Sequence, residues 1–151
     1  MVKKKFIIFA ILLIFLNGCG YSPIFSKKNN FSIIELAVSG NKEINKIIIN
    51  SLNYYKVSEG ENSFSVIIDN SLGKEISSKD TKGNPKTFKI NVISKIKVKN
   101  SKGEINEKIF SKSINYNNKS NKFDLKTYEN ETIKNFGRKI SEEIIIYLQS
   151  I

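Results

Sequence analysis

The side chains that most often perform enzymatic chemistry are scarce in this sequence of 151 residues, which contains one cysteine, Cys19, and no histidine. Histidine-based zinc sites, serine–histidine catalytic pairs, intrachain disulfides and CxxC redox motifs are therefore excluded. Paired carboxylates remain, but Glu142 and Glu143 adjoin on an expected helix and point in different directions. Glu129 and Glu131 lie near the start of that helix, where acidic residues favour the helix dipole. The sequence therefore predicts no catalytic residue, no metal site and no cofactor.

The single cysteine stands directly after a segment that is typical of protein export. Three lysines at positions 3 to 5 precede an apolar run from Phe6 to Leu16, which is shorter than the roughly 20 residues that a membrane-spanning helix needs. Asn17 and Gly18 then lead straight into Cys19, which resembles the lipobox of bacterial lipoproteins. In that pattern a diacylglycerol group is attached to the cysteine thiol, and the residue before it is small. We therefore expect residues 1–18 to be a lipoprotein signal peptide and Cys19 to be the lipidation site, with palmitate among the attached acyl chains.

The alternative is a soluble secreted protein in which the cysteine is incidental, although an unpaired thiol would then be exported to an oxidising compartment. By resemblance to lipoprotein sorting rules, Gly20 after the cysteine points to the outer membrane of a Gram-negative bacterium, on its periplasmic side. Residues 19–30 are expected to be the lipidated N-terminus and a polar tether. No long linker interrupts residues 31–151, which are predicted to form a single domain anchored to the membrane by lipid.

Hydrophobic periodicity predicts strands and helices along that domain. The expected elements are a strand at 31–38, a helix at 42–55, a strand at 63–70 that residues 74–80 extend, a loop at 81–86, a strand at 88–99, a strand at 104–116 and a C-terminal helix of about twenty residues between 125 and 148. A bulge near Ile109 would account for a change of phase in the last strand. The order favours an α+β fold, a two-layer sandwich with a mostly antiparallel four-stranded sheet and two helices on one face (β-α-β-β-β-α).

Lysines alternate with apolar residues on the clearest strand, so they should share the sheet face that the helices leave open. The candidate ligand-binding residues are Lys86, Lys89, Lys95, Lys97 and Lys99. If the turn after this strand has two residues, Glu104, Asn106 and Lys108 lie beside the lysines. The formal net charge of +11 is compatible with an acidic ligand. A merely solvated face competes with that interpretation, because an AT-rich genome also favours a chain rich in Lys, Asn and Ile. Nucleic acid is disfavoured because of the export signal and the aromatic residues at core spacing.

The run Gly18-Cys19-Gly20-Tyr21-Ser22-Pro23-Ile24-Phe25 resembles the N-terminal signature of the LptE family of lipopolysaccharide-assembly lipoproteins. In that signature Gly, an aromatic residue, a variable residue, Pro and an apolar–aromatic pair follow the lipobox cysteine. The family's order of elements is also similar to the one expected here. The resemblance implies a non-enzymatic component of the lipopolysaccharide translocation complex, which plugs a large outer-membrane β-barrel, assists its assembly and binds lipopolysaccharide. The hairpin at 88–116 and the loop at 81–87 are expected to contact the phosphates of lipid A in the lipopolysaccharide.

Two other functions stay open. The chain could be another outer-membrane lipoprotein, acting as an auxiliary or bridging component of a lipid-transporting ABC system. An anchored hydrolase is disfavoured because the sequence lacks catalytic residues.

Overall fold

The computed structural model describes residues 31–57, 60 and 62–151. The predicted signal peptide (residues 1–18), the lipidation of Cys19 and the tether (residues 19–30) lie outside the described residues. The elements are β1 (Phe31–Gly40), α2 (Lys42–Val57), β2 (Asn62–Lys79), β3 (Pro85–Asn100), β4 (Ile105–Asn117) and α3 (Lys122–Gln149). Their order is the predicted one.

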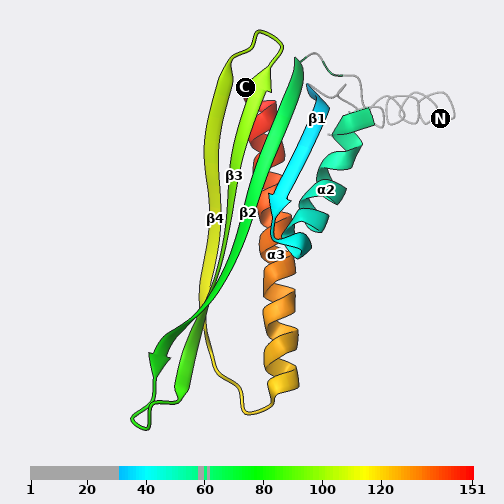
Figure 1. The fold of residues 1–151 in the computed structure, drawn as a ribbon. Coiled ribbons are helices and arrows are strands. Elements are labelled where there is room, and N and C mark those ends of the chain that lie inside the picture. The colour runs from blue at the N-terminus through cyan, green and yellow to red at the C-terminus, as the bar shows by residue number, and fades with distance from the viewer. Residues whose placement is uncertain (1–30, 58–59, 61) are drawn as a thin grey trace, which may run out of the picture.

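The strands form one sheet in the spatial order β1-β2-β3-β4, and both helices pack against the same face (Figure 1). β1 pairs in parallel with β2, whereas β2 with β3 and β3 with β4 pair antiparallel. Parallel neighbours need a crossover connection, and α2 provides it. The predicted two-layer α+β sandwich is confirmed, with a sheet that is mixed because of its first strand.

The core lies between the sheet and the helices. The α2 stripe of Ile44, Ile48 and Leu52 is completely buried, as its spacing of four residues predicts. α2 is rich in Ile and Asn, which are mediocre helix formers, so burial of this stripe is what holds the helix. Ile140, Ile144 and Leu148 of α3 are equally buried against the strands.

Asparagine side chains cap both helices at their N-termini. Asn41 Oδ1 accepts hydrogen bonds from the backbone N–H groups of Glu43 and Ile44, each at 3.1 Å. Asn121 does the same at the start of α3, which has 28 residues and is therefore longer than the predicted helix of about twenty. Capping satisfies backbone donors that the first helical turn leaves unpaired. The cap at Asn121 thus explains why α3 begins before its apolar stripe.

A polar junction of Gly40, Asn45, Asn70 and Ser94 interrupts the core where β1 turns into α2. Ser94 Oγ donates to Asn70 Oδ1 at 2.5 Å, and Asn70 Nδ2 donates to Asn45 Oδ1 at 2.9 Å. The side chains of Asn70 and Ser94 are buried. Gly40 has φ +88, and a Cβ placed there would lie 2.0 Å from the carbonyl oxygen of Asn70. The junction therefore ties three strands and α2 together at a position that requires glycine.

β1 ends opposite Asn70, whereas β2 continues to Lys79 and pairs with β3 from Phe64 onward. Residues 74–79 therefore extend the second strand, as predicted. The hairpin of β2 and β3 projects beyond β1, as Figure 1 shows. None of the helices in the described part of the chain combines the length and the apolar character needed to cross a bilayer.

Candidate binding surface on the open sheet face

The open face of the sheet is the one opposite the helices. The inward positions of β3 alternate without a break, because Ile90, Val92, Ser94, Ile96 and Val98 are all buried. The odd positions therefore face outward, and four of the five candidate lysines, Lys89, Lys95, Lys97 and Lys99, lie together on the open face. Lys86 is the second residue of β3, at an irregularity where the pairing of β2 with β3 skips it. The structure thus groups four of the candidates and separates one.

The neighbours of these lysines differ from the predicted ones. Lys99 pairs with Ile105, Lys97 with Glu107, and Lys95 with Ile109. Glu104, Asn106 and Lys108 were expected beside the lysines, and this prediction is wrong. The turn has three residues between Asn100 and Glu104, with Gly103 at φ +83, rather than two. One extra residue reverses which side chains of β4 share a face with the lysines.

The even positions of β4 point toward α3 instead. Lys108 Nζ lies 4.6 Å from the ring centroid of Tyr147, and Lys112 forms an ion pair with Glu143. The register of β4 against β3 is continuous through Ile109, so the predicted bulge there is absent and that prediction is also wrong. The apparent change of phase arises because Ile105 and Ile109 face solvent while Phe110 and Tyr116 face the core.

Ion pairing divides the lysines on the open face into two kinds. Lys97 Nζ lies 2.7 Å from a carboxylate oxygen of Glu107, and Lys89 Nζ lies 3.5 Å from one of Glu75. Within the described part of the chain no ion pair includes Lys95 or Lys99. Both are exposed on β3. Both are therefore available to an anionic ligand, with Asp69 of β2 opposite Lys95.

Exposed isoleucines lie beside these cations. The exposed fractions are 52% for Ile67, 59% for Ile105 and 64% for Ile109. Ile67 pairs with Lys97 from β2, while the other two flank Lys99 and Lys95 from β4. We define the Lys–Ile patch as Ile67, Lys95, Lys97, Lys99, Ile105 and Ile109. Cations and branched apolar side chains side by side fit an amphiphilic partner with both acidic groups and hydrocarbon.

The turn between β2 and β3 is well organised around one carboxylate. Asp80 Oδ1 accepts hydrogen bonds from the backbone N–H groups of Lys82 at 2.9 Å and Asn84 at 2.8 Å. These bonds, those from Asn84 first, hold the pKa of Asp80 below its usual range. Gly83, at φ +84, completes the turn. The predicted loop at 81–86 is thus a tight turn that ends at Pro85, where β3 begins.

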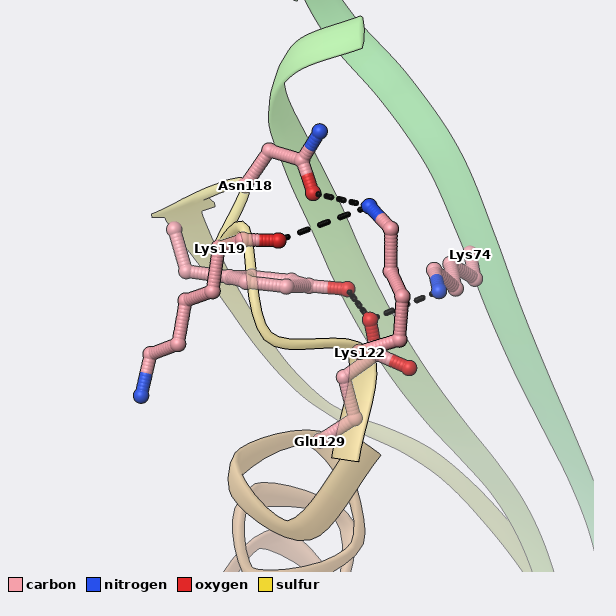
Figure 2. Close-up of polar contacts among 6 residues, drawn as sticks. Lys74, Asn118, Lys119, Lys122 and Glu129 are labelled. Atoms are coloured by element: carbon pink, nitrogen blue, oxygen red, sulfur yellow. Dashed lines mark hydrogen bonds and ion pairs between the residues drawn. The ribbon is translucent and has the colours of Figure 1, made fainter. Parts of the chain in front are cut away.

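Glu129 of α3 joins the projecting hairpin to the helix layer (Figure 2). Its Oε1 lies 2.6 Å from Lys74 Nζ and accepts a hydrogen bond from the Tyr116 hydroxyl at 2.8 Å. Lys74 Nζ also lies 4.7 Å from the ring centroid of Phe88. Burial, with the hydrogen bond to Glu129 and its negative charge, raises the pKa of Tyr116. Since one oxygen of this carboxylate already contacts a cation and a hydroxyl, we interpret Glu129 as a structural group.

The fold is one that several bacterial lipoproteins of known structure share. The rare lipoprotein B from Shewanella oneidensis aligns with a TM-score of 0.62 and 16% identity, over 79% of this chain and 94% of that chain. A minor lipoprotein from Acinetobacter baumannii gives a TM-score of 0.56 at 5% identity, over 81% of this chain and 92% of that one. Lipoprotein B from Nitrosomonas europaea gives 0.54 at 10% identity, over 79% and 84%. No family model and no curated protein matches the sequence.

Proposed function

We propose that this protein is a lipid-anchored outer-membrane component of the lipopolysaccharide assembly and translocation complex. It acts by contact rather than by catalysis: it plugs a large β-barrel partner, assists the assembly of that barrel and binds lipopolysaccharide. The observation that carries the proposal is the structural similarity to rare lipoprotein B, which covers 94% of that chain. The Gly18–Phe25 run, which resembles the LptE signature, supports it independently.

The Lys–Ile patch is the surface that we assign to lipopolysaccharide. Lys95 and Lys99 can form charge-assisted hydrogen bonds with phosphate groups. Ile67, Ile105 and Ile109 can cover hydrocarbon beside those phosphates. Lys97 is held by Glu107, so its contribution requires that it exchange that partner for the ligand. The patch is built on three paired strands, which keeps its side chains at fixed spacing.

The barrel contact is assigned to the long hairpins. β2 and β3 project beyond β1 and α2, and the turn at their end is held by hydrogen bonds to Asp80. A rigid, polar projection of this kind suits the interior of a wide barrel, whose lumen is polar.

Co-purification from detergent-solubilised outer membrane tests the proposal. A stoichiometric large barrel is expected to accompany the lipidated protein. Recovery with an inner-membrane transporter complex instead would favour the alternative, an auxiliary or bridging lipoprotein of a lipid-transporting ABC system.

Charge reversal tests the assigned surface. Lys95→Glu with Lys97→Glu is expected to weaken lipopolysaccharide binding, because each change replaces an attraction for phosphate with a repulsion. The matched control is Lys126→Glu with Lys139→Glu, two exposed lysines on α3. Equal binding by the two double variants would show that the patch is not the binding surface.

A further inference from the structure

A groove between the two helices carries a second cluster of cations, in the layer opposite the Lys–Ile patch. We define the helix groove by its lining residues, which are Glu43, Lys46, Ile47 and Asn50 of α2 and Lys134 and Arg138 of α3. Its volume is about 340 Å³, at the lower end of the range for small-molecule sites. We propose that the helix groove binds a phosphate monoester group.

The position of the cations follows from the helix crossing. A Cβ on Gly137 would lie 2.9 Å from Ile47 Cδ1, so α2 and α3 approach closely at this glycine. Lys46 and Arg138 are the chain neighbours of these two contact residues, one on each helix. Lys134 lies one turn before Arg138 and therefore on the same side of α3. The crossing thus brings cations from both helices to one groove.

The charge of the lining matches a phosphate monoester. Three cationic side chains and a single carboxylate, that of Glu43, line the groove, so the lining residues carry a surplus of two positive charges. A phosphate monoester carries about −1.5 to −2 at pH 7, whereas one carboxylate would neutralise only half of the surplus. Lys134 lies 3.7 Å from Glu131, a weak exposed pair. Within the described residues, no ion pair includes Lys46 or Arg138.

The identity of one residue points to an oxyanion. Arg138 is the single arginine among the 25 basic residues of the sequence. Arginine differs from lysine in its planar fork of N–H donors, which binds two phosphate oxygens at once. A chain that uses lysine at every other basic position therefore places this fork in a groove with two further cations and the amide of Asn50.

The single arginine also provides the experiment. Labelling the lipidated, full-length protein in detergent micelles with ¹⁵N-arginine yields one side-chain Nε–Hε signal, which reports on the groove directly. Titration with inorganic phosphate is expected to shift this signal saturably in the millimolar range, beyond the change that sodium chloride of equal ionic strength produces. A signal that phosphate moves no further than sodium chloride does would overturn the proposal.

Three variants that retain Arg138 sharpen the test. Lys46→Gln is expected to weaken phosphate binding by about threefold to fivefold, the effect of one partly exposed charge pair, and Glu43→Gln to strengthen it by a similar factor. Lys139→Gln, which removes a neighbouring exposed charge outside the groove, should change the affinity less than twofold. If Lys139→Gln weakened binding as much as Lys46→Gln, attraction to the overall positive charge would explain the binding, and the proposed site would be refuted.

A second ligand separates the sources of the phosphate group. Dihexanoyl phosphatidic acid carries the same phosphate monoester on a short lipid. Binding at least ten times tighter than inorganic phosphate would identify a lipid headgroup as the occupant, and equal binding would identify a free phosphate compound; both support the groove. The Lys–Ile patch lies on the other layer, so its variant Lys95→Glu/Lys97→Glu should leave the Arg138 titration unchanged. Absence of phosphate binding at the helix groove would therefore leave the proposed function intact. Absence of lipopolysaccharide binding at the Lys–Ile patch would likewise leave the groove proposal intact.

Discussion

Replacing Ser94 with alanine tests whether the polar junction is a network that holds the strands in register. Ser94 lies at an inward position of β3 between Val92 and Ile96, and its hydroxyl group donates to the buried side chain of Asn70. Ser94→Ala removes one oxygen atom and leaves Asn70 Oδ1 without that donor. An unsatisfied buried acceptor costs about 1 to 3 kcal/mol, which for a domain of this size lowers Tm by about 4 to 12 °C. Thermal unfolding of the lipidated protein in detergent, followed by far-UV circular dichroism, measures the change.

A double-mutant cycle determines whether the junction acts as a unit. Asn70→Ala removes the partners of both Ser94 and Asn45, so it should cost more than Ser94→Ala. The double variant should then cost about 1 kcal/mol less than the sum, because Ser94 has already lost its acceptor. Ser111→Ala, at an exposed position of β4, is the control and should change stability by less than about 0.5 kcal/mol. Additive effects, or a Ser94→Ala variant as stable as the control, would refute the network.

Three further predictions concern other parts of the chain. Gly40→Ala should destabilise the fold by more than about 2 kcal/mol in urea unfolding, because the new Cβ would lie 2.0 Å from the Asn70 carbonyl oxygen at positive φ; Gly83→Ala, at a similar φ with open space, should cost less. The Tyr116→Phe variant should be less stable than the unsubstituted protein below pH 10, and this difference in stability should become smaller above pH 10. The folded-state pKa of Tyr116 lies above the ordinary value of 10.0, so its contribution is complete below pH 10 and falls as pH rises toward that folded pKa; a deficit constant with pH would contradict this. Cys19→Ser should abolish metabolic labelling with palmitate, and retained label would show that Cys19 is not the acylated residue.

The hydrophobic pattern predicts the elements well because one face of each is buried. The Ile44, Ile48 and Leu52 stripe of α2 and the alternation along β3 follow directly from this one-sided burial. Ser94 breaks that alternation in the sequence, yet it is buried as completely as its neighbours. Its partner Asn70 lies on another strand, so a pairing of polar residues across strands replaces the expected hydrophobic contact. A single strand read alone does not contain that information.

The sequence does not predict the isoleucines of the Lys–Ile patch beside the lysines because that prediction depends on the length of the turn between β3 and β4. One extra residue in the turn shifts every later residue of β4 by one position in the pairing with β3. A turn of two residues would place Asn106 beside Lys97, whereas the turn of three residues places Glu107 there. The three-residue turn follows from local chemistry: Asn100 Oδ1 accepts hydrogen bonds from the backbone N–H groups of Lys102 and Glu104, and Gly103 adopts positive φ. These four residues therefore decide whether Lys95 and Lys99 have polar or isoleucine neighbours on β4. The amphiphilic character of the proposed binding surface thus depends on the length of a turn that contributes no side chain to it.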